Sequence, residues 1–209
     1  PSSITAKKRF DQSDHFMSSA ALAELGFIVV HIDGRGTPLR SKEFLDLSDG
    51  WKTSASHLPD HIAGLRQLAE RYPYMDMSRV GIFGGWTTSI GPLYGLLEYA
   101  EFYKVGITCS IPHSELQAAF CVEQFEGPLH TKPSNVQAEC LAENLQGKLL
   151  MMHGMLDLLC LPAATFRVVD ALQKANKDFD LVLLPNQSHG CSGNPYFTRR
   201  IWDYFVKHL

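Results

Sequence analysis

Hydrophobic positions follow two alternating patterns along the chain. Short, continuous apolar runs are separated by longer stretches in which apolar residues recur every three or four positions. Continuous runs are typical of strands covered on both faces, and the longer spacing is typical of helices that pack against a sheet. Glycine, proline and aspartate lie at the changes between the two patterns. The sequence therefore predicts an α/β fold, with a mostly parallel sheet and helices on both of its faces.

The runs that predict strands are residues 27–32, 80–83, 105–109, 149–153 and 179–184. Helical spacing predicts helices over residues 13–25, 59–71, 92–100, 163–175 and 196–208. The polar, glycine-rich residues 33–56 are expected to form a long loop, and residues 110–146 an irregular stretch with one or two short helices. No repeat, low-complexity tract or linker divides the chain, so residues 1–209 are expected to form one domain.

Composition narrows the function classes. The 209 residues are 45% hydrophobic and 20% charged, with a formal net charge of −3, which is far from the composition of a disordered chain. Because no run of lysine or arginine is present, no nucleic-acid surface is predicted. No apolar stretch approaches the roughly 18 residues that a membrane span needs. The five cysteines include no C-x-x-C pair, and we expect neither a disulfide framework, nor a metal site, nor a cofactor.

Three turns that carry candidate catalytic residues follow predicted strands. Residues 84–91 follow the second predicted strand, Asp157 follows the fourth and His189 follows the fifth. Loops that leave the carboxyl ends of parallel strands meet at one edge of the sheet. The chain order of glycine turn, acid and histidine is that of an α/β-hydrolase triad. In such a triad the histidine takes the proton of the nucleophile, and the acid orients the imidazole.

Several segments agree in order and spacing with one known family. They are Gly26-Phe27-Ile28-Val29-Val30, Asp33-Gly34-Arg35-Gly36-Thr37, Asp60-His61-Ile62, Leu65-Arg66-Gln67-Leu68, Arg79-Val80-Gly81-Ile82-Phe83-Gly84, His153-Gly154 with Asp157, Asp170-Ala171-Leu172 and Pro185-Asn186-Gln187-Ser188-His189-Gly190. These segments span nearly the whole chain and resemble the catalytic domain of the prolyl oligopeptidase family, especially its dipeptidyl-peptidase branch. The resemblance implies an α/β-hydrolase fold, cleavage of peptide or other acyl bonds, Asp157 as the triad acid and His189 as the triad base.

The nucleophile is where this sequence departs from the family. The family's turn reads G-x-S-x-G-G, and an ungapped match that starts at Gly84 places Trp86 at the serine position. A shift by one residue places Thr87 there, and a shift by three places Ser89 there. The shift by three suits Pro92, because this proline then lies in the first turn of the following helix. The same shift requires the nucleophile turn to hold three extra residues, although the distance to the next matched segment is unchanged. All three positions remain candidates.

Other positions of the resembling site also differ. The family follows the acid with Asp-Asn-Val, whereas this chain continues with Leu158-Leu159-Cys160, so Leu159 is assigned to the substrate pocket. Two aromatic positions of the family's proline-accepting pocket correspond to Cys121 and Phe125, so one ring is lost. A tyrosine that supplies an oxyanion donor in the family would precede residue 1.

The resemblance also implies a strand that this sequence does not supply. In the family's sheet, a strand lies between those that correspond to residues 27–32 and 80–83. Its absence would leave backbone hydrogen-bonding groups unpaired in the core. We therefore expect residues 1–209 to be the C-terminal part of a longer family domain, or a partner chain to complete the sheet.

Three functions remain open. The first is a serine hydrolase that acts on a peptide or small acyl substrate, with His189 as general base, Asp157 as its orienting acid and Ser89 or Thr87 as a displaced nucleophile. The second is a pseudoenzyme, a binding or interaction module in which Trp86 fills the site. The third is a non-hydrolytic enzyme that uses His189 and Asp157 for acid–base chemistry without a covalent step.

Overall fold

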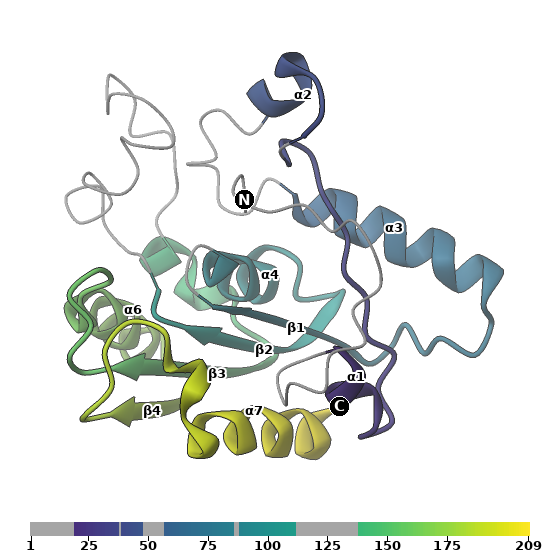
Figure 1. Cartoon of the computed structure of the whole chain (residues 1–209). Coiled ribbons are helices and arrows are strands. Elements are labelled where there is room, and N and C mark those ends of the chain that lie inside the picture. Colours follow the sequence, from purple (N-terminus) through teal and green to yellow (C-terminus); the bar gives the residue numbers. More distant parts are fainter. Residues whose placement is uncertain (1–18, 38, 48–56, 86–87, 112–137) are drawn as a thin grey trace.

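A parallel, four-stranded sheet lies at the centre of the molecule (Figure 1). The computed structural model describes residues 19–37, 39–47, 57–85, 88–111 and 138–209. The strands lie side by side in chain order, and they are β1 (Val80–Gly85), β2 (Tyr103–Cys109), β3 (Lys148–Gly154) and β4 (Asp180–Leu184). Four of the five predicted strands are thereby confirmed, each with its ends within two residues.

The alternation of side chains across the sheet explains the continuous apolar runs. In β3, Leu149 and Met151 belong to the core cluster on one face of the sheet, and Leu150 and Met152 belong to the cluster on the other face. None of these four residues is more than 1% exposed. A strand that is buried on both faces needs apolar residues at successive positions, which is the pattern that the sequence shows.

Helices cover both faces of the sheet, as predicted. The helices of the described residues are α1 (Ser19–Ala23), α2 (Lys42–Asp46), α3 (Leu58–Arg71), α4 (Ile90–Glu98), the 3-10 helix η2 (Ala138–Asn144), α6 (Pro162–Lys174), the 3-10 helix η3 (Cys191–Gly193) and α7 (Pro195–His208). Side chains from α3, α4 and α6 pack in the cluster that contains Leu149, and side chains from α7 pack in the cluster that contains Leu150. Among the described residues, no helix combines the length and the apolar character that crossing a membrane would require.

One of the two short helices near the N-terminal end differs from the prediction. α2 lies inside residues 33–56, whose polar composition predicts a loop. Ser41 explains the helix, because its Oγ accepts a hydrogen bond from Phe44 N at 3.2 Å and so caps the first turn. α1 covers only the later part of the helix predicted over residues 13–25, whose first residues lie outside the described part of the chain.

Residues 27–32 do not form the strand that their apolar run predicts. They pass the sheet without joining its ladder of backbone hydrogen bonds. Phe27 packs edge to face on Phe205 of α7, with ring centroids 6.1 Å apart. The carbonyl of Ile32 lies 3.0 Å from His61 Nε2 of α3 and accepts its hydrogen bond. The prediction is wrong because an apolar run indicates packing between helices, whereas a strand also needs a neighbouring strand to pair with.

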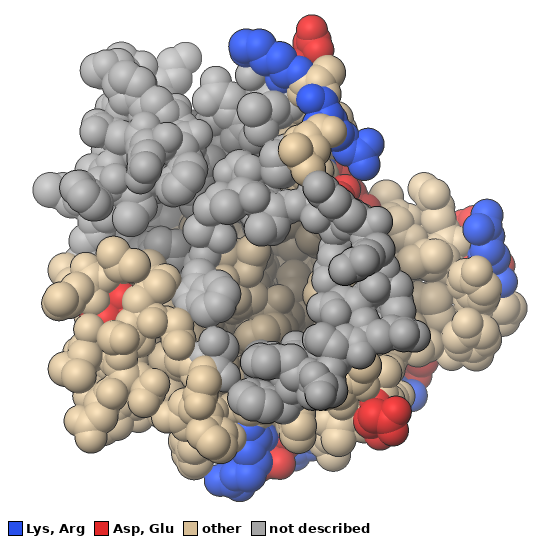
Figure 2. Space-filling view, viewed as in Figure 1, with Lys and Arg blue, Asp and Glu red and all other residues tan. Residues whose placement is uncertain are grey.

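A cavity separates this segment from the sheet. It has a volume of about 1200 Å³, and its walls include residues 25–35 on one side and residues 79–85 on the other. Figure 2 shows a hollow in this region, and its visible floor is formed by residues other than Lys, Arg, Asp and Glu. Within the described part of the chain, β1 pairs with β2 alone, so the second edge of β1 faces the cavity.

Candidate active site

The loops that follow β3 and β4 are joined by a backbone hydrogen bond at the carboxyl edge of the sheet. Leu156 N donates to the carbonyl of Gln187 at 2.9 Å. Gly154 permits this approach, because a Cβ at that position would lie 2.6 Å from the carbonyl oxygen of Gln187. The first loop carries Asp157 and the second carries His189, so the contact fixes the two residues relative to each other.

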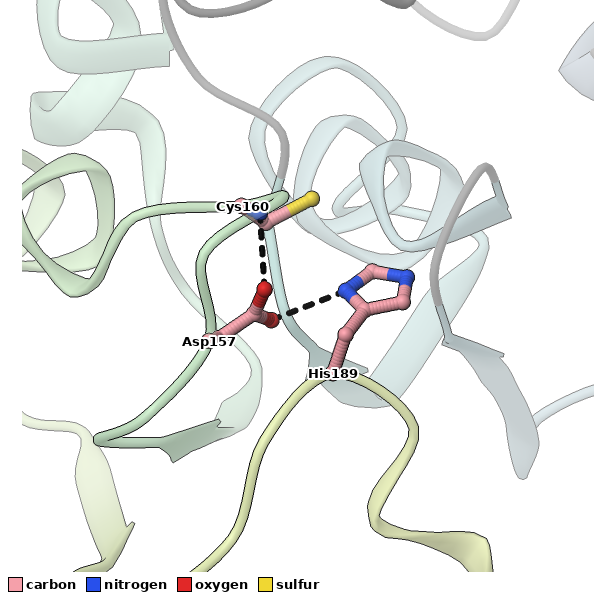
Figure 3. Close-up of side chains that lie close together, drawn as sticks. All are labelled: Asp157, Cys160 and His189. Atoms are coloured by element: carbon pink, nitrogen blue, oxygen red, sulfur yellow. Dashed lines mark hydrogen bonds and ion pairs between the residues drawn. The ribbon is translucent and has the colours of Figure 1, made fainter.

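Asp157 and His189 meet at this edge (Figure 3). His189 Nδ1 donates a hydrogen bond to Asp157 Oδ2 at 2.9 Å. Leu159 N and Cys160 N donate to the other oxygen, Oδ1, at 2.9 and 2.8 Å. Asp157 is 1% exposed, whereas the side chain of His189 is 26% exposed. The buried carboxylate is therefore oriented from both sides, and it holds the imidazole in the tautomer with the proton on Nδ1.

The surroundings of Asp157 favour its ionised form. Burial alone would raise its pKa, but the hydrogen bonds from Cys160 N and from His189 outweigh burial and hold the pKa below its ordinary value. A carboxylate in this position stabilises the imidazolium that forms when the histidine takes up a proton. In chemical terms, the pair can act as a general base through Nε2, which lies on the side of the ring away from Asp157 (Figure 3).

A second histidine supports the loop that carries Asp157. His153, at the end of β3, is fully buried, and its Nε2 donates to the carbonyl of Cys160 at 2.7 Å. Its Nδ1 accepts a hydrogen bond from the hydroxyl of Thr165 at 2.7 Å. Burial lowers the pKa of His153 and so favours the neutral ring. No motif predicts this role, because Thr165 lies in α6 and meets His153 only in the folded chain.

Replacing Thr165 with valine should destabilise the protein by roughly 1–3 kcal/mol, because the buried Nδ1 of His153 then has no donor. Thr198→Val is the matched control. Thr198 Oγ1 is also buried, but it has no hydrogen-bond partner within the described residues, so its loss should change the free energy of unfolding little. Urea unfolding compares the two variants. Equal destabilisation would contradict the role assigned to His153.

The turn after β1 is tightly packed. A Cβ on Gly84 would overlap the carbonyl oxygen of Thr88 and would lie 2.9 Å from Pro92 Cδ, so only glycine fits there. Ser89 immediately precedes α4 and is fully buried. Its Oγ donates to the carbonyl of Ser110 at 3.3 Å. The structure thus places Ser89 inside the protein, beside the end of β2.

The other predicted site residues divide into two groups. Four lie outside the described residues, and they are Trp86, Thr87, Cys121 and Phe125. Leu159 lies at the site, where its backbone N–H contacts Asp157 and its side chain is 53% exposed. The structure therefore brings Asp157, His189 and Leu159 together, and it adds Cys160 and His153 as residues that hold the acid in place.

Sequence comparisons identify one family. The sequence model of the prolyl oligopeptidase family matches residues 14–107 and 129–209. Dipeptidyl peptidase 8 of Homo sapiens is 29% identical over 177 residues, which are 80% of this chain and 19% of that protein. Dipeptidyl peptidase family member 1 of Caenorhabditis elegans is 25% identical over 168 residues, which are 78% of this chain and 21% of that protein. The chain thus spans about a fifth of the length of these relatives.

Solved structures share the fold. A protein of Bacteroides ovatus described as a dipeptidyl aminopeptidase IV superposes with a TM-score of 0.75 at 24% identity, over 85% of this chain and 26% of that one. Acylaminoacyl peptidase of Pyrococcus horikoshii superposes with a TM-score of 0.71 at 17% identity, over 84% of this chain and 31% of that one. The predicted α/β-hydrolase fold is thereby confirmed. Since the family's sequence model covers most of its length, the chain belongs to the prolyl oligopeptidase family.

Proposed function

We propose that this serine-peptidase-like domain keeps the acid–base half of a hydrolase site and has lost the serine that attacks the substrate. Asp157 orients His189 as a general base toward a peptide or other acyl ligand, and Trp86 occupies the nucleophile position in the sequence. Covalent hydrolysis is then impaired. The site is left to bind its ligand, or to move a proton without forming a covalent intermediate.

The hydrogen bond between His189 Nδ1 and Asp157 Oδ2 carries this proposal. At 2.9 Å it is the bond that keeps a catalytic imidazole in the tautomer whose Nε2 accepts a proton. Its acceptor is buried and its donor ring is partly exposed, as an orienting acid and an accessible base require. The pair also lies beyond the carboxyl ends of parallel strands, where ligands of open α/β sheets bind.

The packing of Gly84 against Thr88 supports the loss of the nucleophile. A sharp turn from a strand to a helix brings together the residues two before and two after its central position. In the sequence, Gly84 and Thr88 flank Trp86 in this way, as the ungapped match requires. The burial of Ser89 and its bond to the carbonyl of Ser110 weigh against the three-residue shift. Tryptophan has no group that attacks a carbonyl carbon.

A fluorophosphonate probe tests this proposal, because such probes react with activated serine hydroxyls. The wild-type protein is expected to stay unlabelled. Labelling that disappears in Ser89→Ala or Thr87→Ala would instead identify a displaced nucleophile and a working serine hydrolase. If the probe does not label the protein, but the protein turns over a substrate and His189→Ala abolishes that turnover, acid–base chemistry without a covalent step is favoured.

We further propose that an extended strand, from a longer form of this polypeptide or from a partner chain, fills the cavity beside β1. The cavity of about 1200 Å³ lies along the edge of β1 that has no partner strand in the described part of the chain. Its opposite wall, residues 27–32, is held by contacts with α3 and α7, which cover the two faces of the sheet. A strand between these walls would pair with β1 and give residues 27–32 a neighbouring strand, which they lack among the described residues.

Native mass, oligomeric state and hydrogen exchange test the proposed strand. The β1 amides are expected to exchange slowly, and the native protein to be longer than residues 1–209 or associated with another chain. The proposal would be contradicted if the native protein were a monomer of these 209 residues and if the β1 amides that point away from β2 exchanged as fast as solvent-exposed amides.

A further inference from the structure

We propose that Asp157, Cys160 and His189 form a binding site for Zn²⁺. The ligand atoms are a carboxylate oxygen, a thiolate sulfur and an imidazole nitrogen, and a fourth position is left for water or another ligand. The inference goes beyond the proposed function, because it depends only on where these three side chains lie and not on the identity of the nucleophile.

The three donor atoms lie close together. Each is within 4.8 Å of the others. Figure 3 shows the thiol of Cys160 on the side of the carboxylate where the ring of His189 lies. Zinc holds sulfur at about 2.3 Å and nitrogen or oxygen at about 2.0–2.2 Å, which places tetrahedral donors roughly 3.3–3.6 Å apart. The most distant donors therefore have to approach each other by up to roughly 1.2–1.5 Å, which rotation of the Cys160 side chain about its Cα–Cβ bond can supply.

Hydrogen bonds around the site orient its ligands. Leu159 N and Cys160 N both bind Asp157 Oδ1, which leaves Oδ2 facing His189. His153 holds the backbone of Cys160 by donating to its carbonyl oxygen at 2.7 Å. In metal sites, supporting bonds of this kind fix the ligands and contribute roughly 10–100-fold to affinity.

The donor set suits zinc in both charge and chemical character. A carboxylate, a thiolate and a neutral imidazole carry two negative charges, which a divalent cation neutralises at a place where Asp157 and Cys160 are buried. Mixed nitrogen, sulfur and oxygen donors favour zinc over magnesium and calcium, which prefer oxygen ligands alone. Three protein ligands with a fourth open position are the arrangement of catalytic zinc sites.

Zinc binding and the Asp157–His189 hydrogen bond exclude each other. The metal takes the lone pair of His189 Nδ1, so the proton that now lies in this hydrogen bond leaves Nδ1, and the neutral imidazole carries its single proton on Nε2. The thiol proton of Cys160 passes to the solvent as the Zn–S bond forms. Each zinc ion therefore releases about one proton and inhibits any reaction that needs the acid–base pair.

Metal titration of the purified, metal-free protein tests the site. Zn²⁺ is titrated by calorimetry and Co²⁺ by absorption, because cobalt bound to a cysteine thiolate gives a sulfur-to-metal charge-transfer band. We expect one ion per chain, about one proton released per zinc, and the charge-transfer band with cobalt. Cys160→Ala should abolish the band and weaken zinc binding at least about 10-fold, and His189→Ala should weaken zinc binding similarly.

Two other cysteine variants serve as matched controls. Cys140→Ala removes an exposed thiol and Cys191→Ala removes a buried one, and both should bind the two metals as the wild type does. Thermal unfolding without metal establishes that each variant is folded. No zinc binding by the wild type, unchanged binding by Cys160→Ala, or a band that is lost in either control would overturn the proposal. These readouts record metal binding, so they fail or succeed independently of probe labelling.

Discussion

Replacing Trp86 with serine is expected to make the protein react with a fluorophosphonate probe that leaves the wild type unlabelled. The ungapped register places residue 86 at the nucleophile position, two residues after Gly84, and Asp157 already holds His189 in the tautomer that can accept a serine proton. General-base assistance of this kind accelerates a reaction by roughly 10²–10⁴-fold. The time course of labelling, followed by in-gel fluorescence, measures the gain.

Two double variants establish whether the gain depends on the proposed arrangement. Adding His189→Ala to Trp86→Ser should slow labelling by roughly 10²–10⁴-fold, because the base is lost. Adding Ser89→Ala to Trp86→Ser should leave the labelling rate unchanged, because Ser89 is buried against the carbonyl of Ser110. A folded Trp86→Ser variant that stays unlabelled would count against the ungapped register.

Removing the carboxylate of Asp157 is expected to destabilise the protein by roughly 1–3 kcal/mol for each donor that it leaves buried and unpaired. Asp157→Ala takes the acceptor away from Leu159 N, Cys160 N and His189 Nδ1 at once. Donors left unpaired in a buried place lose their hydration without compensation. Asp157→Asn should cost less, because its carbonyl oxygen can still accept from the two backbone N–H groups. Urea unfolding at neutral pH measures both losses.

Asp170→Ala is the control for this experiment. It removes an exposed carboxylate from α6, where Asp170 and Lys174 form a surface ion pair at 2.6 Å. Exposed pairs of this type contribute at most about 1 kcal/mol. If Asp157→Ala lost no more stability than Asp170→Ala, the carboxylate of Asp157 would not organise its loop as the structure indicates.

The same carboxylate should make the protein less stable in acid. Because the pKa of Asp157 is lower in the folded than in the unfolded chain, the unfolded state binds more protons as the pH falls. Its stabilising contribution is complete above the unfolded-state pKa of about 3.9 and is lost as the pH falls through the folded-state value. Unfolding free energies of Asp157→Asn, which lacks this ionisation, should therefore vary less with pH below about pH 4.

The sequence predicts those parts of the fold that depend on local pattern. The run that contains Leu149 to Met152 is apolar at every position because β3 is covered on both faces. The placement of Asp157 and His189 near each other follows from a general property of parallel sheets, because both residues follow the carboxyl ends of neighbouring strands. Local pattern and sheet geometry together were therefore enough to predict that Asp157 and His189 lie close to each other.

Features that depend on contacts between distant segments could not be predicted. Residues 27–32 have the apolar run of a strand, but pairing depends on a neighbour that the run itself does not specify. The proximity of Cys160 to His189 has no signature in spacing, because the two residues belong to different loops. The short helix capped by Ser41 was missed for a different reason, since polar composition outweighed a local cap in the prediction.

The order of the strands also has a consequence during synthesis of the chain. Since β1, β2, β3 and β4 are neighbours both in sequence and in space, each strand can pair with the one translated just before it. The four described strands can thus assemble in the order β1 to β4 while the ribosome is still adding the later ones. Until a segment pairs with the outer edge of β1, that edge is open to a neighbouring nascent chain, so we expect premature association in crowded polysomes to begin there.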